Sequence, residues 1–220
     1  MSNIVVLSGG MDSATILGLL AAQFIPSHDI YALAFDYRQR HRKELEAAKA
    51  LARHYHIPLR IEPLPMLHGS ALINPTVEVP EGSYDDESMA ATVVHGRNLL
   101  FASVAVAFAQ PDDEVWFGVH AGDHAIYADC RPDFWQPLDD LVRHAYRVTL
   151  RTPWLSLTKG QIAARGKLWG VPYHLTWSCY KGGEKHCGRC GTCVERAEAL
   201  DGFDPTDYED PSFWREAVSA

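Results

Sequence analysis

The sequence predicts an α/β protein built on a doubly wound, mostly parallel sheet, followed by a small C-terminal subdomain. Short β-branched apolar runs alternate with helical patterns over residues 1–170, and this alternation is typical of β-α-β units. Four of the five cysteines are crowded between Cys179 and Cys193, a spacing that favours a metal site over disulfides. We therefore expect an α/β domain over 1–170 and a zinc-binding subdomain over 171–220.

Length, composition and charge narrow the class of protein. A chain of 220 residues with 47% hydrophobic content can bury one good core. The formal net charge of −8 argues against a broad basic surface that grips nucleic acid, and it favours a small-molecule substrate. No apolar run approaches the length of a membrane span, and nothing marks export. We expect a cytoplasmic protein.

The first strand and the turn after it predict a phosphate-binding loop. Residues 4–7 form a buried strand pattern, and Asp12 and Ser13 then begin a helix, so the positive helix end lies at the strand's carboxyl end. An aspartate beside a polyanion implies a bound Mg²⁺. A plain strand–turn–helix with a serine-rich cap is the alternative. The expected nucleotide contacts are Leu7, Ser8, Gly9, Gly10, Met11, Asp12, Ser13, Ala14, Thr15, Ile16 and Leu17.

The next segments complete a β-α-β-α-β unit. Residues 28–35 predict a second buried strand, Lys43 to His54 a helix and Leu59 to Pro63 a third strand, with right-handed crossovers that place helices on both faces of the sheet. Asp36 and Tyr37 end the second strand, so they are expected near the ligand crevice. A solvated basic loop is the alternative for this stretch.

A long segment without periodicity, residues 67–94, predicts a lid-like insertion. It is followed by Arg97, Asn98 and an apolar helix over residues 99–108. Arginine at a helix start can bind a carboxylate or phosphate as a fork. The alternative for Asn98 is a simple N-cap.

A strand is predicted over residues 114–119, and ionisable residues follow it, among them Asp123, Asp129 and Asp133. Ionisable groups gathered at a strand's carboxyl end indicate a site. A helix over residues 132–146 comes next. Thr158 then caps a further helix, whose first turn carries Lys159, where a cation opposes the helix dipole. Contact with ATP phosphates would explain this lysine, and a solvated side chain is the alternative.

The cysteines follow the spacing Cys179-x7-Cys187-x2-Cys190-x2-Cys193. Glycines between the last three let their thiolates converge, and four soft ligands close a tetrahedral zinc site. Because no position stays open for water, this zinc would be structural. An iron–sulfur cluster fits the same ligands and is the alternative. Cys130 is left unpaired.

The chain resembles a known family in several motifs. Ser-Gly-Gly-x-Asp-Ser at residues 8–13 resembles the PP-loop of the ATP pyrophosphatases. Together with residues 35–41, 96–98 and 129–131 and the four cysteines, nearly the whole chain resembles the QueC family, the 7-cyano-7-deazaguanine synthases of queuosine biosynthesis. The chain departs from that pattern at His95, where a proline is usual, and at Ala125, Ile126 and Ala128.

The resemblance implies an adenine nucleotide alpha hydrolase-like fold of PP-loop type and a C–N bond-forming ligase. Such an enzyme converts 7-carboxy-7-deazaguanine, ATP and ammonia to 7-cyano-7-deazaguanine through adenylate and amide intermediates. It also implies Mg²⁺ with ATP, a structural Zn²⁺, a homodimer, and no membrane or direct nucleic-acid partner. Rival hypotheses are a ligase that stops at 7-amido-7-deazaguanine, a PP-loop tRNA-modifying enzyme and a non-enzymatic zinc ribbon.

The same resemblance assigns roles to individual residues. Asp12, Ser13 and Lys159 are expected to be catalytic, with Asp36 and Lys159 completing the ATP contacts. The expected substrate-binding residues are Tyr37, Arg97, Asn98, Asp123, Asp129 and Asp133, and the metal ligands are Cys179, Cys187, Cys190 and Cys193.

Overall fold

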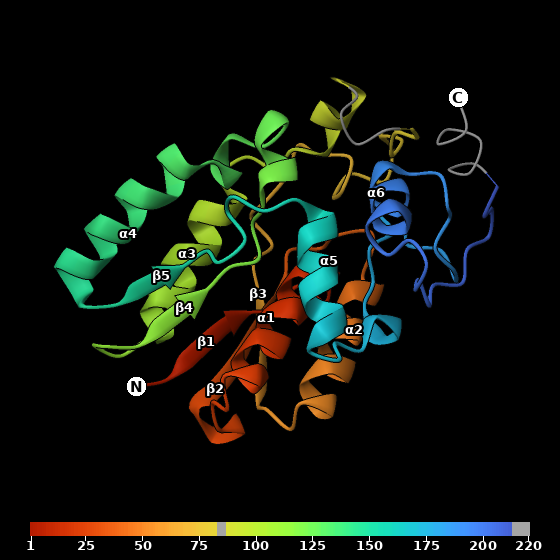
Figure 1. The fold of residues 1–220 in the computed structure, drawn as a ribbon. Coiled ribbons are helices and arrows are strands. Elements are labelled where there is room, and N and C mark those ends of the chain that lie inside the picture. Colours follow the sequence, from red (N-terminus) through yellow and green to blue (C-terminus); the bar gives the residue numbers. More distant parts are fainter. Residues whose placement is uncertain (83–86, 213–220) are drawn as a thin grey trace.

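A single parallel sheet organises the molecule. The computed structural model describes residues 1–82 and 87–212 (Figure 1), so residues 83–86 of the expected insertion and residues 213–220 of the expected subdomain lie outside the described part. The sheet has five strands in the order β3-β2-β1-β4-β5, all paired in parallel. The strands are β1 (Asn3–Val6), β2 (Ile30–Asp36), β3 (Leu59–Pro63), β4 (Glu114–Trp116) and β5 (Thr149–Arg151). The order confirms the doubly wound sheet. Strands β2 and β3 are added on one side of β1, and β4 and β5 are then added on its other side.

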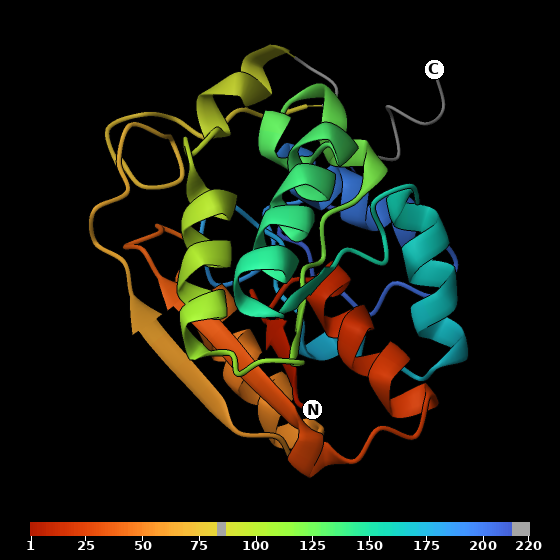
Figure 2. The same cartoon turned by 90° about the vertical axis from the view of Figure 1, so that its left-hand side faces the viewer.

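Helices cover both faces of this sheet (Figures 1 and 2). One apolar core holds α1 (Met11–Ala22), α2 (Lys43–His54) and α5 (Lys159–Leu168) against the sheet. A second core on the opposite face holds α3 (Arg97–Phe108) and α4 (Pro132–Tyr146). Successive strand residues alternate between these cores, as Val5 belongs to the first and Val6 to the second.

Some predicted element bounds agree with the structure and others differ from it. Three elements match residue for residue, namely α2, β3 and α4. The second strand begins later than expected because Ser27–Asp29 form a 3-10 helix, and the strand expected over residues 114–119 ends at Trp116. Strand β5 was not predicted, because three residues are too few to show a periodic pattern. Asn98 is not an N-cap: the cap position of α3 is Gly96, with a left-handed φ of 70°.

One helical run passes a length and hydropathy test for a membrane span, which corrects the expectation that no run approaches that length. The run is Met89–Phe108. It is interrupted by the turn at Gly96 between the 3-10 helix Glu87–Thr92 and α3. Helix α3 buries Phe101, Ala102 and Ala105 in the second core, as the core helix of an α/β protein does.

After α5 the chain returns across the carboxyl end of the sheet and reaches α6 (Gly191–Ala199), which packs against α5. The cysteine cluster at the start of α6 shares its apolar core with Val79 from the insertion. An isolated antiparallel bridge between Glu81 and Cys190 and a hydrogen bond from Gly82 N to Arg189 O (3.0 Å) join the same two segments. The insertion and the cysteine segment therefore lie side by side.

Candidate active site

A cavity lies at the carboxyl end of the strands, beside β1, where the strand order changes from one side of the sheet to the other. Its walls come from the loop after β1, the end of β2, the start of α3, the segment after β4, α5 and the chain around the cysteines. In doubly wound sheets ligands bind at this position. Segments that are distant in sequence, the starts of α1 and α2 among them, thus contribute side chains to one space.

Close backbone packing shapes the phosphate loop. Gly9 has a φ of 89°, and a Cβ built on it would lie 2.1 Å from the backbone oxygen of Glu44, so only glycine fits. A Cβ on Gly118 would lie 3.0 Å from the backbone nitrogen of Ser13. Within the described part of the chain, no side chain caps the first turn of α1. The backbone N–H groups of that turn, together with the hydroxyls of Ser8 and Ser13 (3.2 Å apart), suit an anion.

Charged side chains converge beside this loop. The Lys159 Nζ lies 2.6 Å from Glu195 Oε2 and 3.4 Å from Asp12 Oδ2. His120 Nε2 lies 3.5 Å from Asp123 Oδ2 and 3.8 Å from Asp12 Oδ2. Burial alone would lower the pKa of Lys159, but the charges of Asp12 and Glu195 outweigh it and raise that pKa. Lys159 is therefore a firmly protonated cation at the cavity wall.

One atom of this cluster bears on the expected Mg²⁺. Asp12 Oδ1 is buried and has no hydrogen-bond partner within residues 1–82 and 87–212. A buried carboxylate oxygen without a partner is costly, and carboxylate oxygens are the ligands that Mg²⁺ prefers. The residues present therefore fit a divalent cation at Asp12.

The other end of the cavity is aromatic and carries an arginine. Tyr37, Phe101, Tyr127 and Tyr180 line it together with Arg97. Burial, and then the charge of Glu44, raise the pKa of Tyr37, so its hydroxyl is a neutral donor. Tyr127 donates or accepts a hydrogen bond with Thr92 Oγ1 at 2.6 Å. Flat apolar walls beside one guanidinium suit a planar, acidic heterocycle.

The structure brings many of the expected site residues to the cavity. Those that line it are Leu7, Ser8, Gly10, Met11, Asp12, Ser13, Tyr37, Arg97, Asn98, Asp123 and Lys159. Asp123 lies with the charged cluster by the phosphate loop, and therefore closer to the expected nucleotide contacts than its expected substrate role implied.

Other expected site residues lie outside the cavity lining. Ala14, Thr15, Ile16 and Leu17 are buried in α1, and Gly9 packs against α2. Asp36 Oδ2 lies 2.5 Å from Arg42 Nη2. Asp129 accepts a hydrogen bond from Asn98 N at 3.2 Å and so supports the start of α3. Asp133 lies in the first turn of α4.

Sequence reasoning placed His120 in the polar run after β4 that indicates a site, but it gave this histidine no role. It did not identify Glu195 at all. Glu195 comes from α6, 36 residues after Lys159, and nothing in its local sequence distinguishes it from a solvated helical glutamate. Only the packing of α6 against α5 places it beside Lys159, which lines the cavity.

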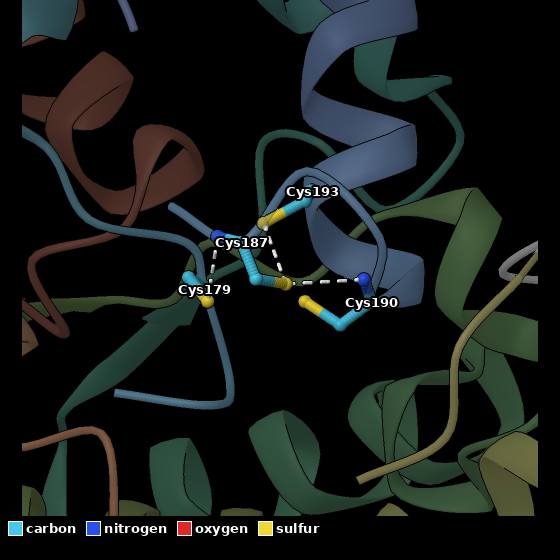
Figure 3. A group of neighbouring side chains, drawn as sticks. All are labelled: Cys179, Cys187, Cys190 and Cys193. Carbon is cyan, nitrogen blue, oxygen red and sulfur yellow. Dashed lines mark hydrogen bonds between the residues drawn. The ribbon is translucent and has the colours of Figure 1, made fainter. Parts of the chain in front are cut away.

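The four cysteines form a buried cluster beside the cavity (Figure 3). Their sulfurs lie within 4.8 Å of one another, with Cys187 and Cys193 3.9 Å apart. Sulfurs about 2.3 Å from a tetrahedral zinc would lie about 3.8 Å apart. Backbone N–H groups of Arg189 and Cys190 point at Cys187 Sγ (3.4 and 3.3 Å), and hydrogen bonds from Cys179, Cys190 and Cys193 lower the pKa of Cys187. This group could hold a metal ion.

The sheet order, the glycine loop at the central strand and the lysine–aspartate pair beside it define an α/β protein of the PP-loop class. A family model described as queuosine biosynthesis protein QueC matches residues 2–204. This chain belongs to the QueC family.

Named relatives are similar over nearly their whole length. A protein of Brucella ovis named 7-cyano-7-deazaguanine synthase is 45% identical over 229 residues, covering 98% of this chain and 97% of the relative. One of Allorhizobium ampelinum with the same name is 45% identical over 233 residues, covering 100% and 97%. Among solved structures, the U34-tRNA thiolase NcsA from Methanococcus maripaludis with its [4Fe-4S] cluster has a TM-score of 0.49 and 16% identity over 82% of this chain and 62% of its own.

Proposed function

We propose that this protein is an ATP-dependent ligase that converts 7-carboxy-7-deazaguanine and ammonia to 7-cyano-7-deazaguanine. Membership of the QueC family supports the proposal, as do two relatives named 7-cyano-7-deazaguanine synthase. The observation that carries it is one cavity that holds both a phosphate loop with Asp12 and Lys159 and, beyond them, Arg97 among aromatic walls. Such a cavity suits an aromatic acid placed in line with a nucleotide.

The chemistry begins with a poor electrophile. A carboxylate repels nucleophiles and cannot expel an oxide, and adenylation removes both obstacles. The substrate carboxylate attacks the α-phosphate, and the helix start at Ser13 and the Lys159 cation stabilise the departing pyrophosphate. When bound at Asp12, Mg²⁺ would supply further neutralisation of the phosphate charge.

Ammonia then displaces AMP and gives the amide. A second adenylation, on the amide oxygen, lets AMP leave again as the nitrile forms. These steps need positioning and charge neutralisation and no side-chain nucleophile. Arg97 is our candidate for holding the substrate carboxylate, with Tyr37 and Asn98 beside it.

The departures from the family pattern do not favour the amide-stopping alternative. His95, Ala125 and Ala128 are exposed, and among the described residues neither these three nor Ile126 lines the cavity. Tyr127, between them, is buried and does line it. None of these departures therefore alters the cavity lining that both adenylation steps would use.

We further propose that the cysteine cluster holds a structural Zn²⁺, that the chain acts in the cytoplasm and that it forms a homodimer. All five cysteines are free, which suits metal binding in a reducing compartment. Elemental analysis and analytical ultracentrifugation of the purified protein test the first and the last of these.

The test of the proposed activity is release of AMP and pyrophosphate. Both should form when ATP, Mg²⁺, ammonium and 7-carboxy-7-deazaguanine are present together, and neither without the acid. Turnover that instead requires tRNA and a sulfur donor would favour a tRNA-modifying enzyme. Absence of nucleotide hydrolysis with every acceptor would favour a non-enzymatic module.

A further inference from the structure

One histidine in the cavity wall has a ring nitrogen that the fold leaves unused. His41 is 2% exposed and lines the cavity. Its Nε2 lies 3.2 Å from Glu44 Oε2. Its Nδ1 is buried and has no hydrogen-bond partner among residues 1–82 and 87–212. Because a buried polar atom without a partner costs free energy, this nitrogen indicates a ligand.

A hydrogen-bond network fixes the carboxylate that faces His41. Gln39 Nε2 donates to Glu44 Oε1 at 3.0 Å and to the backbone oxygen of Phe35 at 3.1 Å. The backbone of Tyr37 in turn donates to Gln39 Oε1 at 2.9 Å. Glu44 is thus held from the end of β2. Its remaining oxygen favours a proton on His41 Nε2, which leaves the lone pair on Nδ1.

His41 is also close to the phosphate loop. The backbone oxygen of Glu44 is the atom that a Cβ on Gly9 would strike at 2.1 Å, so the start of α2 packs directly on the loop. The ionisable groups that share this part of the cavity are Glu44 from α2, Tyr37 from the end of β2, Tyr180 from the cysteine segment, whose ring lies 5.2 Å from that of His41, and Arg97 from α3.

The proposed reaction needs a proton acceptor close to the reacting nitrogen. Amide formation joins ammonia to the acyl carbon, breaks the bond to AMP and releases one proton from nitrogen. Conversion of the amide to the nitrile releases two more. Lys159 and Arg97 are protonated cations, and burial raises the pKa of the Cys130 thiol. The Nδ1 of His41, without a hydrogen-bond partner in the described part of the chain, is placed to accept such protons.

We propose that His41 is a catalytic residue that accepts the proton from the attacking nitrogen and that Glu44 positions it. This inference rests on the proposed function. In the step, the ammonia lone pair forms the C–N bond, the C–O pair leaves with AMP, and a nitrogen proton passes to His41 Nδ1. The Glu44 carboxylate balances the imidazolium charge that results, and nothing is oxidised or reduced.

The test separates the nitrogen step from adenylation. His41→Asn keeps a hydrogen-bonding atom near the position of Nδ1 but removes its basicity. Adenylation of a carboxylate releases no proton, so exchange of labelled pyrophosphate into ATP with the acid alone should stay within about 2-fold of wild type. Amide formation at saturating ammonium should fall about 10²- to 10⁴-fold. Glu44→Gln should show the same pattern with a smaller loss.

A matched control is His124→Asn. His124 also has a buried ring nitrogen without a partner in the described part of the chain, but it does not line the cavity. We expect it to leave both rates near wild type. Replacing ammonia by hydroxylamine should shrink the His41→Asn deficit, because the hydroxylamine adduct gives up its proton more readily. A purely structural role would not produce that difference.

Three results would overturn this inference. Amide formation in His41→Asn within about 3-fold of wild type would exclude the proton transfer. An equal loss of exchange and amide formation would make His41 a ligand-holding or structural residue. A deficit as large with hydroxylamine as with ammonia would argue against a base. If instead the wild-type protein catalysed neither exchange nor amide formation, the proposed function itself would fail.

Discussion

At the scale of single residues, Asp12 and Ser13 are the proposed contacts between the first helix and the nucleotide. Replacing either by alanine should reduce pyrophosphate release at least about 100-fold, because each loses a group aimed at phosphate or its cation. The fold should survive, since both side chains lie at the cavity and not in the core. A pyrophosphate assay with circular dichroism checks both statements, and Ser103→Ala, on the exposed side of α3, is the control. Full turnover in both variants would remove this loop from the mechanism.

The pairing of Lys159 predicts a pH dependence. Burial lowers its pKa, and Asp12 and Glu195 more than reverse that effect, so the folded pKa lies above the ordinary value. The pair's contribution to stability is then complete below an unfolded pKa of about 10.4 and is lost only as pH rises through the higher folded pKa.

Loss of the positive charge of Lys159 should therefore not limit adenylation between about pH 7 and pH 9.5. Pyrophosphate release at saturating substrates, measured across that range, checks this expectation. Glu195→Gln removes one of the two charges and should move any alkaline decline to lower pH. A wild-type decline centred near pH 8, absent in Lys159→Arg, would contradict the assignment.

At the scale of elements, the cysteine cluster fixes the start of α6, and α6 carries Glu195. Cys190→Ser should release the metal and lower the free energy of unfolding by several kcal/mol, because binding at a closed site is largely folding free energy. Elemental analysis and thermal unfolding measure both effects. Cys130→Ser, which removes a cysteine outside the cluster, should keep the metal. Iron, or no metal in the wild-type protein, would contradict zinc.

The insertion is a second element with an identifiable attachment. Arg40 donates to the backbone oxygens of Ala71, Val77 and Pro75 at 3.3, 2.8 and 3.3 Å. Arg40→Ala should lower the free energy of local opening by about 2 kcal/mol. This change corresponds to amide exchange about 30-fold faster over residues 71–77. Hydrogen exchange with mass spectrometry measures this rate, and Arg53→Ala, at an exposed position of α2, is the control. Unchanged exchange would show that the Arg40 side chain does not hold the insertion.

At the scale of the whole molecule, local patterns predicted the sheet better than they predicted the site. The bounds of α2 and α4 could be read from periodicity and from Pro132 at a first turn. The phosphate loop was predictable because it is contiguous. The contact of Lys159 with Glu195 depends on two helices packing together, and no local signal encodes it. The sequence predicts a ligand contact for Asp129, yet its carboxylate accepts a hydrogen bond from Asn98 N at the start of α3.

We propose that one cavity activates the same substrate twice. The most direct measurement is a time course by mass spectrometry with 7-carboxy-7-deazaguanine, ammonium and excess ATP, in which AMP is quantified beside the deazapurines. We predict that 7-amido-7-deazaguanine rises and then falls as 7-cyano-7-deazaguanine accumulates, with two AMP formed per nitrile. Amide that accumulates while AMP stops at one equivalent would show that the second activation does not occur.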